Sequence, residues 1–362
     1  MSSLKPQPVA PTWLGGNDAR EELELALLSS RQRERWKYTK AAAVQALLPH
    51  EGSQPEFVEL PSGISVRLLN PTQQDAPVDA DPHASPEAFA ALCYAPQILI
   101  IDAHASPAGS LTISHQGQRL PIVLNLAEGV ELTLNEIGSS HGQSQQTLWI
   151  QMSANSRLIH SRNSFGGGTH WQYLNAELAR DAHYQLHNHA GGADLRRQDI
   201  RIVCAGPGAH AELHGAAMVA ANSHLDQHLT LEHTAPHTTS NQTLHNIAGE
   251  AAKVTFNGRI HIHANCNGVA AELSNKNLSV GKTATINTKP ELEIYTDDVK
   301  CAHGATVGQI DDGHLFYCAS RGINPDQARS LLSHAFLATC TGGPLADQAT
   351  AQFNADFGGP SQ

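Results

Sequence analysis

The chain has 362 residues, a formal net charge of −11 and 40% hydrophobic residues, which is ordinary for a soluble protein with one large core or two modest ones. It contains no run of eighteen apolar residues and does not begin like a signal peptide, so we expect a cytoplasmic protein without a membrane partner. It also has no Lys/Arg-rich run of the kind that binds phosphate backbones, which argues against nucleic acid as a partner.

The N-terminal residues 1–70 are predicted to form a helical region. Asn17 is a suitable N-cap for a helix that ends near residue 30, and a second helix is predicted from Lys40 to Leu48. The residues that follow are rich in Pro, Asp and Gln, and we interpret residues 71–95 as a linker.

Residues 96–312 are predicted to form the core, because short alternating segments separated by Gly, Asn, Asp or Pro are typical of all-β proteins. These segments read ILIID, SLTIS, PIVLNL, VELTLNE, TLWIQM, HWQYL, DIRIV, HLTLEH, KVTFN, RIHIH and ELEIY.

A weak internal repeat sharpens this prediction. Leu186, Leu213, Leu244 and Leu273 recur at intervals of 27, 31 and 29 residues, and such a period suggests stacked units that share one core. We therefore favour a β-helix or similar β-solenoid. A β-sandwich and a cupin barrel remain alternatives.

The C-terminal residues 313–362 are predicted to be helical. Asn324 is expected to cap a helix that has Pro325 at its first position and an apolar stripe that includes Leu331, Leu332 and Phe336. This helix could cap the solenoid or present its apolar face to another protein, and the pattern does not separate these two roles.

Metal-ligating residue types are numerous but scattered. The six cysteines form no C-x-x-C pair, so the chain does not encode a self-contained zinc or iron–sulfur site. Among 22 histidines, His187 with His189 and His261 with His263 are spaced to share one face of a strand. A metal site there is one hypothesis. A set of half-buried or solvent-facing sheet residues is favoured, because no carboxylate or cysteine accompanies them at ligand spacing.

The segment Thr296–Thr306 is the strongest candidate for chemistry. Asp297, Asp298, Cys301 and His303 fall within seven residues, after a predicted strand and before an expected turn at Gly304. Cys301 and His303 would share one face of an extended backbone and supply half of a four-ligand set. A buried Cys beside a hydrogen-bonded His is the alternative. No phosphate-binding loop or familiar catalytic motif is present, so we expect no bound nucleotide.

Several ordered motifs resemble the SufB/SufD family of iron–sulfur cluster assembly scaffolds. They are WKYT, VTFNGRIHIH, AELSNKNL, NTKPELEIYTDDVKCAHGATVGQID and LFYCASRGIN. The residues His303 to Gln309 are more similar to the SufD branch than to the SufB branch, which remains the alternative within the family.

The resemblance implies a mainly β fold with a right-handed parallel β-helix core and helical N-terminal and C-terminal regions. It also implies a non-catalytic scaffold that pairs with a SufB-like paralogue at the β-helix end and docks a SufC-like ATPase through its C-terminal helices. A homodimer in isolation is possible. A His-rich β-helix or cupin-like metalloprotein is the alternative outside the family.

By the same resemblance, His303 matches a ligand of a transient iron–sulfur cluster that is shared with the partner subunit. Cys301 is a weaker candidate for the same role. Leu331, Leu332 and Phe336 match the ATPase-docking region.

Overall fold

The computed structural model describes residues 56–69, 88, 95, 97–115, 120–139 and 141–356. The predicted helices before residue 50, the WKYT motif and most of the expected linker lie outside this part of the chain. Among the helices that are described, none is long and apolar enough to cross a membrane.

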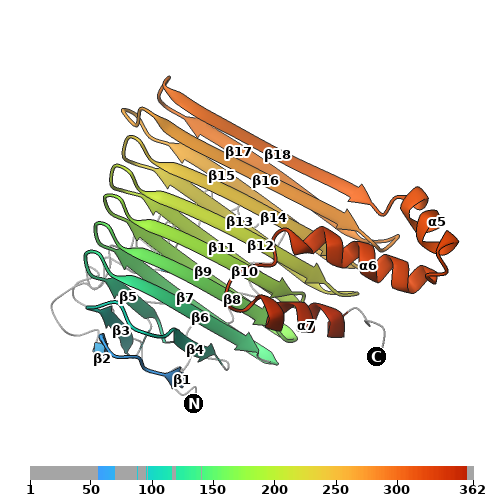
Figure 1. The fold of residues 1–362 in the computed structure, drawn as a ribbon, viewed down its shortest axis with the longest axis horizontal. Helices are drawn as coiled ribbons and strands as arrows, with labels where there is room; N and C mark the ends of the chain where they lie inside the picture. The colour runs from blue at the N-terminus through green and yellow to red at the C-terminus, as the bar shows by residue number, and fades with distance from the viewer. Residues whose placement is uncertain are drawn as a thin grey trace, which may run out of the picture.

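The described strands form two nine-stranded sheets, and the chain alternates between them (Figure 1). Sheet A contains β1 (Glu56–Glu59), β4 (Leu111–His115), β6 (Glu131–Ser139), β8 (Arg157–Phe165), β10 (His183–Gly191), β12 (His210–Val219), β14 (Thr239–Ala248), β16 (Val269–Ser279) and β18 (Val299–Gln309). Sheet B contains β2 (Ile64–Leu69), β3 (Ile98–Ala103), β5 (Ile122–Leu126), β7 (Gly142–Met152), β9 (Gly168–Leu178), β11 (Leu195–Cys204), β13 (His224–His233), β15 (Lys253–Ile262) and β17 (Thr285–Ile294).

The fold is a parallel β-solenoid, as the repeat predicted. From β3 onward each strand pairs in parallel with the strand two places along the chain, so one strand from each sheet makes one turn. The pairs β3–β4 to β17–β18 give eight turns. A β-sandwich or cupin barrel would need antiparallel sheets, whereas among the named strands antiparallel pairing is confined to β1 and β2.

Residues 56–69 correct one expectation. They lie in the range predicted to be helical, but they form β1 and β2, which pair with β4 and β3 at the first edge of each sheet. The segment ISVRLL alternates in burial along most of its length, as a strand with one inward face does, and this period favours a strand over a helix.

Tight turns between the sheets repeat one backbone feature. Asn155, Asp181 and Asn222 have left-handed φ values of 59°, 56° and 60° in three of these turns. Asn and Asp tolerate this conformation better than other residues with a side chain, which explains why they separate the predicted strands.

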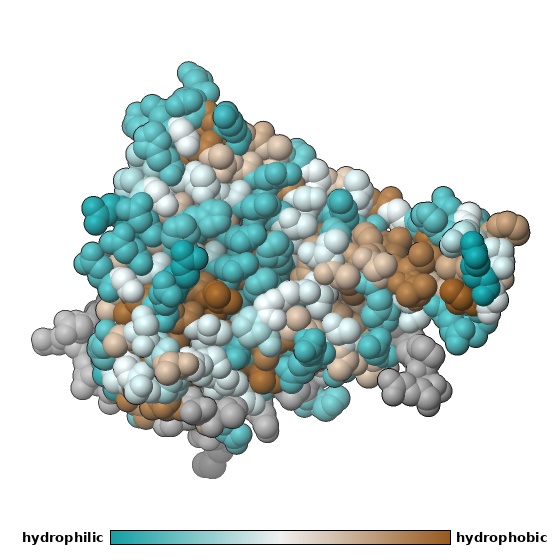
Figure 2. Space-filling model, viewed as in Figure 1, coloured by the Kyte–Doolittle hydropathy of each residue, from teal (hydrophilic) through white to brown (hydrophobic). Residues whose placement is uncertain are grey.

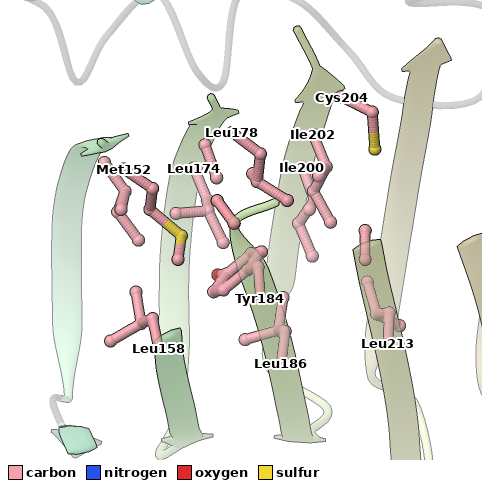
Figure 3. Packing of buried hydrophobic residues seen from close by; sticks show 14 of the residues in the cluster. Met152, Leu158, Leu174, Leu178, Tyr184, Leu186, Ile200, Ile202, Cys204 and Leu213 are labelled. Carbon is pink, nitrogen blue, oxygen red and sulfur yellow. The ribbon is translucent and has the colours of Figure 1, made fainter. Parts of the chain in front are cut away.

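The core lies between the two sheets. Inward-facing residues stack from turn to turn, as Leu158, Leu174, Leu186, Ile200 and Leu213 do in Figure 3. Each strand places alternate residues inward, so the apolar half of the sequence pattern forms one continuous column.

The strand pairing of sheet A shows which of the four repeated leucines lie in one column. Leu186 pairs with Leu213, and the next two residues in that column are Gln242 and Leu273. Leu244 lies two positions further along, opposite Gly215, whose missing side chain leaves room for the leucine. The predicted repeat is therefore correct in period and offset by two residues at Leu244.

Part of the interior is polar. Gln146, Gln172, Gln198 and Gln227 occupy successive turns of sheet B and are linked by side-chain hydrogen bonds of 2.7, 2.8 and 3.0 Å. Each glutamine after Gln146 donates to the one before it, so these buried groups are partly satisfied within the sheet.

Three helices follow the solenoid: α5 (Asp312–Ser320), α6 (Pro325–Ala338) and α7 (Ala346–Asp356). The predicted start of α6 is confirmed, because the side chain of Asn324 accepts a hydrogen bond from the backbone N–H of Gln327 at 2.8 Å. α6 and α7 cover part of the outer face of sheet A, where Phe353 packs edge-to-face on Phe165.

Candidate functional site

The last turn of the solenoid leaves both sheets with an open edge. Among the described strands, β17 pairs only with β15, and β18 pairs only with β16. Backbone N–H and C=O groups along the outer edge of these two strands therefore lack a strand partner in the described part of the chain, as they do at any sheet edge. Figure 1 shows this edge at the top of the stack.

Cys301 and His303 lie on this edge and share the inward face. In the register with β16, Cys301 is opposite Ala271 and His303 is opposite Leu273. Both partners belong to the buried core, so the two candidate ligands continue the core column at the open end of the solenoid.

The two side chains differ in exposure. His303 is exposed, whereas Cys301 is half-buried and packs against the core. Burial raises the pKa of the Cys301 thiol above its ordinary value, so the thiol stays protonated at neutral pH. Because the thiolate is the form that binds a metal, this disfavours Cys301 as a ligand. Of the two candidate ligands, His303 is therefore the more accessible one.

The expected turn at Gly304 is wrong. β18 continues through Gly304 to Gln309, because the whole segment pairs in register with β16. Asp297 and Asp298 are exposed in the connection before β18, and the backbone oxygen of Asp298 accepts a hydrogen bond from the N–H of Gly268 at 2.8 Å.

Cys301 and His303 do not form a complete metal site. In the described residues, neither of them belongs to a group of three or more clustered ligand atoms from Cys, His, Asp or Glu. Two ligands leave at least two positions of a four-coordinate iron open. The remaining described cysteines are buried, and burial raises the pKa of Cys204 to about 12.

The C-terminal helices expose apolar residues away from the sheet. Phe316, Tyr317 and Leu331 are 77%, 59% and 54% exposed. Figure 2 shows apolar residues gathered where α5 meets α6. Leu332 is half-buried, and Phe336 stacks on His245 of sheet A with ring centroids 4.6 Å apart. Among the predicted docking residues, Leu331 is thus the one most open to a partner.

A second group of ligand types comes together on the outer face of sheet B. Glu232, His261 and His263 place one ligand atom each within 4.8 Å of one another. The sequence pattern singled out the two histidines but missed the carboxylate. Glu232 precedes His261 by 29 residues, which matches one turn of the repeat, so the period itself was the available signal.

Comparison with known proteins gives the family. Residues 111–336 match the model for the SufBD core domain of the SUF system for FeS cluster assembly. The chain is similar to the iron–sulfur cluster assembly protein SufD of Escherichia coli, with 34% identity over 224 residues that cover 60% of this chain and 53% of the relative.

Two further relatives agree with this match. A SufBD family iron–sulfur cluster assembly protein of Synechocystis is 32% identical over 52% of this chain and 42% of its own length. The iron–sulfur cluster assembly protein SufB of Bacillus subtilis is 27% identical over 40% of this chain and 31% of its own length. The matches thus span about half the length of the curated relatives or less. The family match covers more than half of this chain and coincides with the solenoid that carries Cys301 and His303, so the chain belongs to the SufBD core family of the SUF iron–sulfur cluster assembly system.

Proposed function

We propose that this chain is a non-catalytic scaffold subunit on which an iron–sulfur cluster is assembled together with a partner chain. The observation that carries the proposal is the position of His303, exposed at the open edge of the solenoid and in register with the core column. The cluster is cargo here, held for transfer. A site with few ligands from this chain suits that task, because a full set of four thiolates would retain the cluster.

The partner is a SufB-like paralogue that adds its own strands to β17 and β18. Edge strands are stabilised when another chain supplies the missing hydrogen bonds. Ile294, Tyr295 and Val307 are exposed at this end, by 38%, 58% and 55%, and a paired chain would remove them from water. We propose that the complex is cytoplasmic.

In such a pairing His303 supplies one ligand and the partner supplies the others. Cys301 is a weaker candidate, because its raised pKa must first be overcome by metal binding. The resulting site is complete only in the paired state, which links cluster assembly to subunit association.

The C-terminal helices dock a SufC-like ATPase, which supplies nucleotide chemistry that this chain does not. The exposed apolar residues Phe316, Tyr317 and Leu331 form the docking surface. Leu332 and Phe336 contribute less to this surface, because Leu332 is half-buried and Phe336 packs on His245 of sheet A.

The ligand role of His303 is tested by anaerobic reconstitution of the complex with His303→Ala, with His314→Ala as the matched control. Both histidines are exposed, but His314 lies on α5, outside the edge. We expect the His303 variant to pair normally and to lose most of its cluster, as measured by iron and sulfide content and visible absorption. An intact complex with unchanged cluster yield would remove His303 from the site.

The docking surface is tested by Leu331→Asp, with the exposed Arg329→Asp on the same helix as control. Deleting the helices would be a blunter test, because α6 and α7 also cover the core of sheet A. We expect Leu331→Asp to weaken ATPase binding by on the order of tenfold or more, as the loss of a central apolar contact does at interfaces. Normal ATPase capture by this variant would contradict the docking assignment.

A further inference from the structure

We infer that Glu232, His261 and His263 bind one divalent transition-metal ion on the outer face of sheet B. This site is separate from the edge that carries Cys301 and His303, and it does not depend on the proposed scaffold function. It lies where β13 and β15 end, one turn before the open end of the solenoid.

The parallel register brings the three residues together. Glu232 is directly opposite His261 in the pairing of β13 with β15. His263 follows two residues later on the same face, and its backbone N–H donates to the carbonyl of His233 at 3.0 Å, which fixes its position. The His261 and His263 rings stack with centroids 4.0 Å apart, and one ligand atom of each lies within 4.8 Å of a Glu232 carboxylate oxygen.

One unpaired atom points to a ligand. Nε2 of His263 is buried from solvent and has no hydrogen-bond partner in the described part of the chain. It lies 3.6 Å from Oε2 of Glu232, beyond normal hydrogen-bond length. Two ligands on a tetrahedral ion with bonds of about 2.1 Å are separated by about 3.4 Å, so this gap is close to that expected across a metal.

Neighbouring groups hold the carboxylate in place. Arg201 donates two hydrogen bonds to Glu232, at 2.9 and 3.0 Å, and each carboxylate oxygen retains a further lone pair. This arrangement resembles the outer-shell contacts that orient metal ligands.

His261 packs between two rings, those of His263 and Tyr295. Tyr295 packs edge-on against the His261 ring with centroids 5.6 Å apart and limits its rotation.

Positive charge nearby tunes the affinity. Arg259 approaches Glu232 at 4.0 Å and pairs with Glu293 at 3.1 Å. Its guanidinium repels a cation and also neutralises a carboxylate beside the site. Two imidazoles and one carboxylate suit Zn²⁺, Fe²⁺ or Co²⁺ better than Mg²⁺ or Ca²⁺, which prefer oxygen ligands.

Calorimetric titration of the chelator-treated full chain with Zn²⁺ tests the site, with Co²⁺ absorption to report the ligand type. The ligand variant is His261→Gln with His263→Gln. Its matched control is His183→Gln with His210→Gln, which removes another contacting pair, with centroids 5.5 Å apart, in which His210 bonds to Thr239. Cys301→Ser is the second control.

We expect one Zn²⁺ per chain in the wild type and in both controls, with a cobalt spectrum free of thiolate bands. The double ligand variant should bind at least about tenfold more weakly, given the size of effects seen around metal sites. Arg259→Gln should bind more tightly than wild type, a gain that a merely structural role of this cluster would not produce. Absence of stoichiometric binding, equal binding by the ligand variant, or binding lost with Cys301→Ser would each overturn the assignment.

Discussion

Two buried histidines, His189 and His233, act as hydrogen-bonding residues within the fold. His233 is fully buried between the hydroxyls of Thr238 and Ser240, at 2.7 and 3.0 Å. Burial lowers its pKa to about 4, and likewise that of His189. A protonated imidazole would need two acceptors and a counter-charge at these positions, so protonation opposes folding.

Stability should therefore fall as the pH is lowered from about 6.5 to about 4. In that window the unfolded chain binds a proton at His233 and the folded chain does not. Each such histidine therefore lowers the free energy of unfolding by up to about 1.4 kcal/mol for each pH unit of acidification. His233→Gln should make the free energy of unfolding depend less steeply on pH, by the equivalent of about one bound proton. Urea unfolding at several pH values across this window measures the change. His314→Gln, on the exposed face of α5, is the control for removing an imidazole. An unchanged slope in His233→Gln would show that this residue is not the titrating group.

At the scale of the single element, β11 shows how one strand combines both kinds of interior. Its inward face carries Ile200 and Ile202 in the apolar column and Gln198 in the glutamine stack. The Gln198 side chain donates to Gln172 and accepts from Asn188 and Gln227. A strand in the middle of a parallel sheet is buried on both sides by its neighbours, so polar residues there are tolerated when they are paired.

Gln198→Ala should destabilise the chain by about 1–3 kcal/mol, because it leaves the amides of Asn188 and Gln227 without their acceptor. Urea unfolding measures the loss, and Gln151→Ala on β7 is the control, since that glutamine is exposed. Equal stability of the two variants would mean that the stack contributes nothing to folding.

At the scale of the whole molecule, the two ends of the solenoid are different. The first edge carries the short antiparallel strands β1 and β2, whereas the last edge carries the long parallel strands β17 and β18. Short length and β-bulges are ways in which proteins protect a sheet edge. β1 is short and has a register shift between Phe57 and Glu59, whereas β17 and β18 are long and pair without a shift. The long edge is therefore the end at which another chain is expected to pair.

In isolation the chain should self-associate through this edge, and Val307→Lys should weaken that association by on the order of tenfold or more. Val307 continues the inward column opposite Asn277, so a lysine there would be buried in a continued solenoid. Thr306→Lys on the same strand points outward and is the matched control. Sedimentation equilibrium measures the change, and equal association of the two variants would place the contact elsewhere.

Local features of the sequence were sufficient for several conclusions. Alternating apolar residues predicted a mainly β chain, and the period near 29 residues predicted stacked turns, because both depend on neighbours along the strand. The start of α6 was also correct, since capping by Asn324 and the placement of Pro325 act within one turn of helix. The family resemblance on the ordered motifs was confirmed by the match of residues 111–336.

Only the tertiary structure decides which residues of neighbouring solenoid turns lie opposite one another. Leu244 is displaced by two residues from the predicted column because Gly215 leaves space for it, and pairing with β16 carries β18 straight through the expected turn at Gly304. Glu232 meets His261 only because β13 and β15 are aligned residue by residue. Hydrogen bonds between strands set this alignment, and they join residues about one turn apart, a separation over which no local propensity acts.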